Sequence, residues 1–241
     1  MIRSAIAAAT TLLVGGVGMW LYAQHWHPSE RAYPFQGIDV SRYQGSIDWQ
    51  DLPHQGVDFA YIKATEGGDL RDSQFASNWR SAAAVGIARG AYHFFTLCRS
   101  GADQAANFMA AVPVDRDALP PAVDLEFGGN CSYRPPREEL LRELGTFLQR
   151  IEARSGKPAV LYLTSEFDDT YRISAVIDRP LWLRSLYFEP QFGARHWTLW
   201  QASNLRQLRG IEGRVDWNAA RLDLARIAPA FGSEGRAENP R

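Results

Sequence analysis

Two carboxylates separated by a single residue stand in PPAVDLEFG, residues 120–128 of the chain. Side chains of a β-strand alternate between two faces, so a strand here places Asp124 and Glu126 on one face and Val123 and Leu125 on the other. The acidic positions then lie about 6.5 to 7 Å apart, and each negative charge raises the proton affinity of the other. Glycosidic cleavage needs such a pair: a protonated acid for the leaving oxygen and an anion that supports positive charge on the sugar.

A DxE triplet alone is a weak signal, because the same residues also occur in solvated loops and in ion pairs with arginine. Two more acids stand in comparable surroundings, Asp39 in GIDVS and Asp216 in RVDWN, each between apolar neighbours. An acid at the end of a strand is costly unless a polar site uses it. In a parallel barrel the carboxyl ends of the strands converge on one mouth, where such folds carry their active sites. We therefore expect these acids to line one cleft with Asp124 and Glu126.

Aromatic residues are numerous, with 8 Trp, 9 Tyr and 12 Phe among 241 residues. Most such rings are core, but an excess also suits a saccharide groove, where rings stack on sugar faces. Four rings come from four different strand-like segments. We predict that they bind substrate, with burial in the core as the alternative; they are Tyr61, Tyr92, Tyr162 and Trp200.

Lys63 lies in YIKATE and shares a predicted strand face with Tyr61 and Thr65. Its side chain points into the barrel or snorkels to the mouth. We favour a structural ion pair, with Glu66 or an aspartate, over direct contact with substrate. His93 falls on the opposite phase of its own strand-like segment, and we interpret it as a core histidine that faces the helices.

Short segments rich in β-forming residues alternate with helix-like stretches. This alternation predicts an α/β fold with parallel pairing, and eight strands suggest a (β/α) barrel of the TIM type. The connections after the sixth and seventh strands are too short or too polar for full helices, so we do not expect a regular eightfold barrel. The predicted strands are residues 37–41, 59–65, 88–95, 122–127, 159–164, 181–187, 197–203 and 214–217, and the predicted helices are residues 73–85, 102–111, 137–154 and 165–176.

Residues 4–23 carry no charge, and as a helix they would span roughly the 30 Å of a bilayer core. Arg3 precedes them, which favours an inside N-terminus and an exported remainder. We favour an uncleaved signal anchor over a cleaved signal peptide, because Leu21 is large for a cleavage site that would follow Ala23. A helix buried in the domain is the third reading.

The predicted organisation is therefore a hydrophobic N-terminal helix at residues 1–24, a linker at 25–34, a barrel at 35–228 and a flexible tail at 229–241. The catalytic part is expected outside the cytoplasmic membrane, in the periplasm or at the cell surface, or secreted if the signal is cleaved. The net charge is −1 and there is no cluster of basic residues, so the sequence does not indicate a nucleic-acid-binding surface. We expect a monomer without a cofactor.

The chain has two cysteines, Cys98 and Cys131, both in predicted loops. Export favours a disulfide between them, and two free thiols are the alternative. The spacing of the Cys and His residues matches no CxxC or HExxH pattern, so we predict no metal site.

Seven short motifs cover nearly the whole predicted barrel in a specific order and spacing: GIDVSRYQG at residues 37–45, DFAYIKATEGGDLRD at 58–72, GAYHFF at 90–95, PAVDLEF at 121–127, LYLTS at 161–165, WTLWQ at 197–201 and VDWN at 215–218. In this order they resemble glycoside hydrolase family 25, the lysozymes that cut peptidoglycan between N-acetylmuramic acid and N-acetylglucosamine. The resemblance implies a flattened, irregular (β/α) barrel. It also implies that Glu126 is the general acid and then base, that Asp124 orients the substrate's acetamido group, and that Asp39 and Asp216 complete the acidic floor.

The same resemblance favours retention of configuration with the acetamido oxygen as internal nucleophile; an Asp nucleophile and inversion are alternatives. A chitinase-like hydrolase also uses DxE, but the longer DxxDxDxE pattern is absent upstream of Asp124. A glycan-binding barrel without activity is the remaining reading, and it would be indicated by the loss of an acid at the mouth. All four acids are present.

Overall fold

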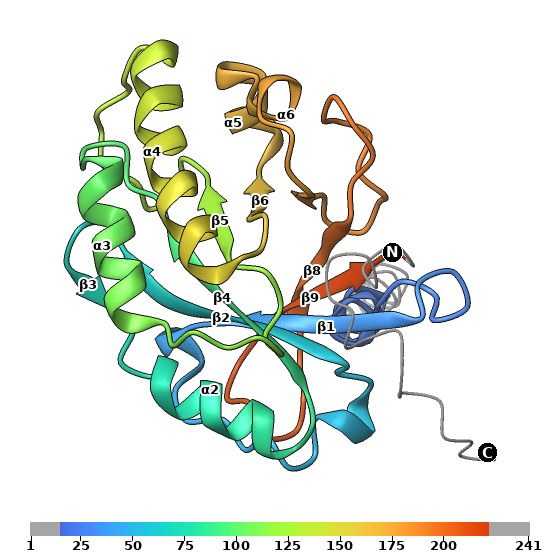
Figure 1. Cartoon of the computed structure of the whole chain (residues 1–241). Coiled ribbons are helices and arrows are strands. Elements are labelled where there is room, and N and C mark those ends of the chain that lie inside the picture. Colours follow the sequence, from blue (N-terminus) through green and yellow to red (C-terminus); the bar gives the residue numbers. More distant parts are fainter. Residues whose placement is uncertain (1–14, 222–241) are drawn as a thin grey trace, which may run out of the picture.

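The computed structural model describes residues 15–221. Eight strands close into a barrel with helices on its outside (Figure 1). A ninth, two-residue strand pairs with the edge of β2 only. The strands are β1 (Phe35–Val40), β2 (Phe59–Glu66), β3 (Leu70–Arg71), β4 (Ala88–Phe94), β5 (Ala122–Leu125), β6 (Val160–Leu163), β7 (Leu181–Arg184), β8 (Leu199–Arg206) and β9 (Val215–Ala220).

The order around the barrel is β1-β9-β8-β7-β6-β5-β4-β2, and the pairing of β1 with β2 closes it. All pairings among these eight strands are parallel except those of β9, which runs antiparallel to both β1 and β8. The predicted α/β barrel is thus confirmed, with one strand reversed. Because β9 is reversed, it begins at the end of the barrel where the other strands finish.

Five helices cover the barrel on the β2 to β7 side: α2 (Phe75–Ala84), α3 (Gly101–Ala111), α4 (Arg137–Ser155), α5 (Ser165–Tyr171) and α6 (Ile173–Val176). The single helix predicted over residues 165–176 is broken at Arg172, whose φ of 54° is left-handed. Between β7 and β9 the structure has loops and no helix, as the short connections predicted. Two short 3-10 turns, Arg42–Gln44 and Pro53–Gln55, follow β1.

Alternation along the strands separates two apolar layers. Val123 and Leu125 of β5 belong to the large layer between sheet and helices, whereas Ala122 belongs to a smaller layer inside the barrel. Asp124 therefore points inward, as the period of two predicted. Ile38 and Val40 flank Asp39 in the same way on β1 and belong to the outer layer.

The outer face of β8 and β9 is covered by the segment that precedes β1. The Trp26 ring lies 6.4 Å from the Trp200 ring of β8, and the Tyr33 ring lies 5.7 Å from it. At the other end of the segment, the Gln24 carbonyl accepts a hydrogen bond from the Gln207 N–H at 3.1 Å. We call residues 24–34 the strap. The segment predicted as a linker is thus held against the barrel, where it takes the place of a helix.

Residues 15–25, which lead into the strap, are helical, and several of their large apolar side chains are exposed. Within residues 15–221, no helix is long and apolar enough to cross a membrane. Residues 1–14 of the predicted hydrophobic helix, the last part of the predicted barrel at 222–228 and the tail predicted at 229–241 lie outside the described residues.

Candidate active site

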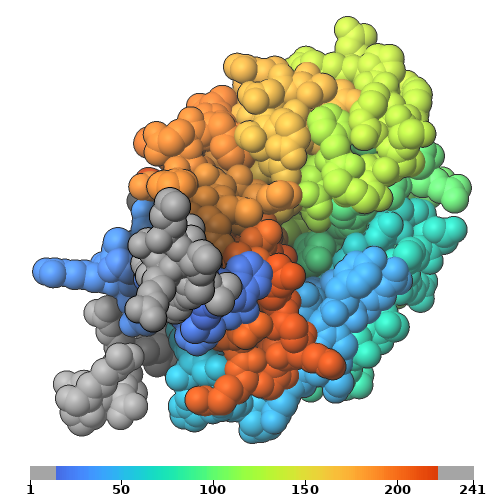
Figure 2. All heavy atoms as spheres, turned by 180° about the vertical axis from the view of Figure 1, so that it is seen from behind, coloured from blue at the N-terminus to red at the C-terminus, as the bar shows by residue number. Residues whose placement is uncertain are grey.

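The four predicted acids meet at the carboxyl end of the barrel. Asp39 is the fifth residue of β1, Asp124 the third of β5, and Glu126 the first residue beyond β5. They border a cavity of about 270 Å³, which opens at the mouth. The face shown in Figure 2 is hollowed between orange, green and red segments. The cavity is lined by Asp39, Tyr92, Asp124, Glu126, Tyr162, Trp182, Arg184, Gln201, Asn204 and Asp216.

Asp216 reaches this mouth for a reason that differs from the expected one. The prediction placed it at the carboxyl end of a parallel strand, whereas it is the second residue of β9. Since β9 is antiparallel, its start lies beside the end of β1, and Asp216 pairs directly with Asp39 in the ladder. The predicted position is right, but the predicted strand direction is wrong.

Asp39 is held by two amide side chains. Its Oδ2 accepts hydrogen bonds from Asn218 Nδ2 at 2.8 Å and from Gln201 Nε2 at 3.1 Å. Each amide is itself oriented by a ring donor: Trp182 Nε1 donates to Asn218 Oδ1 at 2.8 Å, and Tyr162 OH donates to Gln201 Oε1 at 2.9 Å. An indole N–H can only donate, so it fixes which amide atom of Asn218 faces Asp39.

Among the described residues, Glu126 has one charged partner at the mouth. Its Oε2 lies 3.3 Å from Nη1 of Arg184, at the end of β7. The Asp124 side chain differs, because its buried Oδ1 finds no hydrogen-bond partner among the described residues. A buried polar atom without a partner is costly. At the edge of a cavity, such an atom is available to a donor on a ligand.

Burial raises the pKa of all four acids. For Asp39 burial raises the pKa to about 6, against the opposing effect of its two amide donors. For Asp124, burial and then the charge of Glu126 raise the pKa well above its ordinary value. Burial and then Asp39 do the same for Asp216. Burial also raises the pKa of Glu126, but the Arg184 guanidinium opposes this shift. The cluster therefore keeps protons at a pH where ordinary carboxyls have lost them.

Residues 38–211 match the family model described as "Glycosyl hydrolases family 25". The match covers well over half of the chain and includes three of the four acids. The chain belongs to this family. It is a glycoside hydrolase, as the paired carboxyls at the mouth of a (β/α) barrel indicate.

This family 25 hydrolase is similar to several known proteins. It is 34% identical over 205 residues to Lysozyme M1 of Streptomyces globisporus, covering 80% of this chain and 69% of that protein. A family 25 glycosyl hydrolase structure from Bacillus anthracis has a TM-score of 0.76 and 37% identity, over 84% of this chain and 96% of that one. The bacterial lysozyme of Streptomyces coelicolor has a TM-score of 0.73 and 32% identity, over 83% and 98% of the two chains.

Of the four rings predicted to bind substrate, the structure of the family 25 hydrolase places two at the cavity. Tyr92 and Tyr162 line it. Tyr61 is fully buried inside the barrel, where its OH donates to the Pro120 carbonyl at 3.2 Å. Trp200 faces outward, because the next residue along β8 points into the mouth, and its Nε1 donates to the Ser185 carbonyl at 2.6 Å. The assignments of Tyr61 and Trp200 as cleft rings are therefore wrong.

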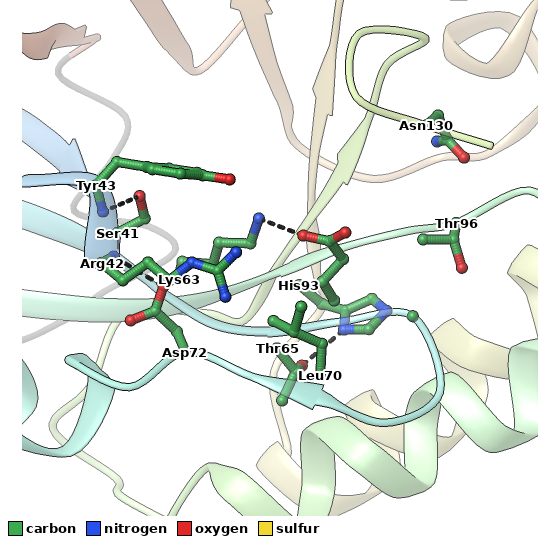
Figure 3. A network of polar contacts seen from close by, with 12 residues as sticks. Ser41, Arg42, Tyr43, Lys63, Thr65, Leu70, Asp72, His93, Thr96 and Asn130 are labelled. Carbon is green, nitrogen blue, oxygen red and sulfur yellow. Dashed lines mark hydrogen bonds and ion pairs between the residues drawn. The ribbon is translucent and has the colours of Figure 1, made fainter.

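The predicted ion pair of Lys63 with Glu66 is confirmed, with 2.8 Å between Nζ and Oε2 (Figure 3). His93 is fully buried, as predicted, and contacts Thr65 Oγ1 at 2.7 Å. Thr65 was expected on the face of Lys63. Lys63 and Thr65 pair with consecutive residues of β4, so Ala64 is an extra residue of β2 without a partner in that pairing. This β-bulge turns Thr65 toward His93 and away from the barrel interior.

Five residues with hydrogen-bonding side chains at this family 25 site were not predicted from the sequence: Trp182, Arg184, Gln201, Asn204 and Asn218. Asn218 and Gln201 lie within quoted motifs, and the inward phase of their strands could have identified them. Trp182 and Arg184 stand two apart in LWLR, and that segment ends at the mouth. The same period of two places both side chains on the inward face of β7, and this was the available signal.

A disulfide joins Cys98 to Cys131, with 6.4 Å between their Cα atoms, so the predicted pairing is confirmed. It connects the loop after β4 with the loop after β5. No group of three or more His, Cys, Asp or Glu side chains arranged to hold a metal occurs within residues 15–221.

Proposed function

We propose that Glu126 is the general acid and base with which this lysozyme hydrolyses peptidoglycan, at the β-1,4 bond from N-acetylmuramic acid to N-acetylglucosamine. The observation that carries the proposal is the position of Glu126 beside Asp124 at the edge of the mouth cavity. A carboxyl there can reach a glycosidic oxygen while its partner faces the same sugar ring. The relatives include one named as a lysozyme and two named N,O-diacetylmuramidase.

The proton of the pair must be on Glu126 when the bond breaks. Burial raises the pKa of both carboxyls, and the charge of Glu126 raises the pKa of Asp124 further, so the pair loses its protons at a higher pH than ordinary carboxyls do. The unpaired Oδ1 of Asp124 is an acceptor for the N–H of an acetamido group. That hydrogen bond favours the ionised form of Asp124, which leaves the proton to Glu126.

Ionised Asp124 would then hold the acetamido group with its oxygen directed at the anomeric carbon. That oxygen forms a bond to carbon as the leaving oxygen takes the proton from Glu126, and the resulting cyclic intermediate carries positive charge next to Asp124. Water, deprotonated by Glu126, opens it with overall retention. An Asp nucleophile or inversion would give a different intermediate or the opposite anomer.

Asp39 and Asp216 form the acidic floor of the cavity, and we propose that Tyr92 and Tyr162 contact the reacting sugar. Burial followed by the charges of nearby acids raises the pKa of both tyrosines, so both remain neutral donors. The hydroxyl of Tyr162 is already committed to Gln201. Its contribution to substrate binding would therefore come mainly from the ring.

The experiment is digestion of purified peptidoglycan by a fragment that begins at residue 24 and so keeps the strap. N-acetylmuramic acid at the new reducing ends would support a muramidase, whereas N-acetylglucosamine there would indicate a glucosaminidase. NMR of the first-formed anomer separates retention from inversion. Glu126→Gln should abolish clearance, and Glu138→Gln, the same change on the exposed first turn of α4, should not. An active Glu126→Gln variant would remove Glu126 from its role.

We further propose that the protein acts as a monomer outside the cytoplasmic membrane, held there by its N-terminal segment or released by cleavage. Residues 4–23 are uncharged, and Met19, Leu21 and Tyr22 are exposed in the helix that leads to the strap. A disulfide persists in an oxidising compartment. Cell fractionation tests the location, and light scattering of the soluble fragment tests the monomer; a cytoplasmic or dimeric protein would contradict the proposal.

A further inference from the structure

Glu126 stands outside the strand that carries Asp124. The last pairing of β5 with β6 is at Leu125, so the main chain of Glu126 has no partner in the sheet. Its carbonyl instead accepts a hydrogen bond from Nδ2 of Asn130 at 3.0 Å. The Asn130 N–H closes the same turn on the Phe127 carbonyl at 3.1 Å. The direction in which the Glu126 side chain leaves the backbone thus depends on the turn at residues 126–131.

The Asn130 side chain also ties this turn to the loop that follows β4. Its Nδ2 donates to the Phe95 carbonyl at 2.9 Å, and its Oδ1 accepts from the Leu97 N–H at 2.9 Å. The same oxygen accepts from the Cys131 N–H at 3.0 Å. Both amide hydrogens and the oxygen are therefore used. Figure 3 shows Asn130 on its loop near Thr96, which lies between the two residues it binds.

The disulfide connects the same two loops next to these hydrogen bonds. Cys131 directly follows Asn130, and Cys98 directly follows Leu97. A covalent tie and a hydrogen-bonded tie therefore run side by side, one residue apart on each loop. The residues that line the cavity do not include Cys98, Asn130 or Cys131, so these three residues do not act on a substrate directly.

We propose that Asn130 is a positioning residue for Glu126, and that Asn130 and the Cys98–Cys131 disulfide act together as one clamp on the turn. This inference rests on the proposed role of Glu126. Misplacement of a catalytic group by about 1 Å can lower a rate by roughly 100-fold. Loss of the clamp therefore lowers kcat, while KM changes little because the residues proposed to bind the sugar lie on the barrel strands, which keep their places.

Asn107 provides a matched control. It is a buried asparagine of α3. Its Nδ2 donates to the Gly67 and Leu70 carbonyls at 3.1 and 3.0 Å, so it ties down a different loop, the one between β2 and β3. Asn130→Ala removes a half-buried amide and Asn107→Ala a buried one, and each amide ties down a loop. Both are expected to lower the melting temperature. Only Asn130→Ala is expected to lower kcat, by about 10- to 100-fold, at a temperature where both variants are folded.

The experiment measures kcat and KM on soluble peptidoglycan fragments for wild type, both asparagine variants, Cys98→Ser/Cys131→Ser and the combined variant. If Asn130 and the disulfide act as one clamp, the fold loss in kcat of the combined variant is smaller than the product of the two separate fold losses. Equal kcat values for Asn130→Ala and Asn107→Ala, or fully multiplying losses, would overturn the inference. An active wild type with an inactive Glu126→Gln variant establishes the proposed function in the same assay, so the two failures are distinguishable.

Discussion

Asp39 and Asp216 are paired across the antiparallel ladder of β1 and β9, so two carboxyl groups face the mouth from adjacent strands. Burial raises the pKa of each, and for Asp216 the charge of Asp39 raises it further. Such an arrangement is unfavourable for folding when both groups are ionised. We therefore expect the ionised acids of the site to lower the free energy of unfolding, by an amount that depends on pH.

The Asp39→Asn variant measures this cost. The pKa of Asp39 is about 6 in the folded protein against 3.8 ordinarily, so the folded state binds more protons between these values. The free energy of unfolding then falls as pH rises from about 4 through about 6. A shift of about two units corresponds to roughly 3 kcal/mol. Asp39→Asn should stabilise the protein by up to that amount at pH 8, and little at pH 4, while activity is lost.

Urea unfolding at pH 4 and pH 8 provides the measurement for Asp39→Asn. Asp69→Asn serves as the control, because the Asp69 side chain is 82% exposed and should respond at neither pH. Equal effects of Asp39→Asn at the two pH values would show that Asp39 does not carry a raised pKa.

Arg184 should set the alkaline limit of activity. Its guanidinium lowers the pKa of Glu126. Replacing it in Arg184→Met removes this opposition, so Glu126 keeps its proton to higher pH and the alkaline limb of kcat/KM moves upward. Arg154→Met, at an exposed site near the end of α4, should leave the profile in place. A limb that stays fixed or moves to lower pH in Arg184→Met would contradict this role.

Trp182 and Trp200 form a matched pair for the orientation of the Asp39 network. Both are buried, and both donate an indole N–H, to Asn218 Oδ1 and to the Ser185 carbonyl respectively. Trp182→Phe leaves the Asn218 amide without its orienting donor, a loss of about 1 kcal/mol, and should lower kcat/KM roughly fivefold to tenfold. Trp200→Phe should lower the melting temperature alone. Equal losses of activity in Trp182→Phe and Trp200→Phe would indicate that Trp200 belongs to the substrate cleft.

The strap should contribute to the stability of the barrel and not to catalysis. Trp26→Ala removes a half-buried ring packed on Tyr187 and Trp200, and we expect a loss of about 2 kcal/mol, below that of a fully buried Trp. Tyr22→Ala, at a site 63% exposed, should cost little. Thermal unfolding of fragments beginning at residues 24 and 35, with and without the strap, adds a second measurement. Equal melting temperatures for the two fragments would show that the strap contributes nothing.

The acids could be predicted from sequence because their signals are local, and the disulfide could be predicted because the chain has only two cysteines. The period of two along a strand predicts which face Asp124 lies on, and the apolar neighbours of Asp39 predict its face in the same way. The failures had non-local causes. The direction of β9 depends on pairing with β1, which no local pattern shows, and the bulge at Ala64 reverses the phase for Thr65. Trp200 was misplaced because its outer face is covered by the strap, from a part of the chain that is distant in sequence.

The turnover of purified peptidoglycan by Glu126→Gln, relative to wild type at the same pH, tests the account most directly. Glutamine keeps the size of the side chain but can neither give nor take the proton. General acid and base catalysis contributes about 100- to 10,000-fold, so we predict a loss within or beyond that range, with the melting temperature unchanged or raised. A variant within tenfold of the wild-type rate would contradict the assignment of Glu126 as the catalytic acid.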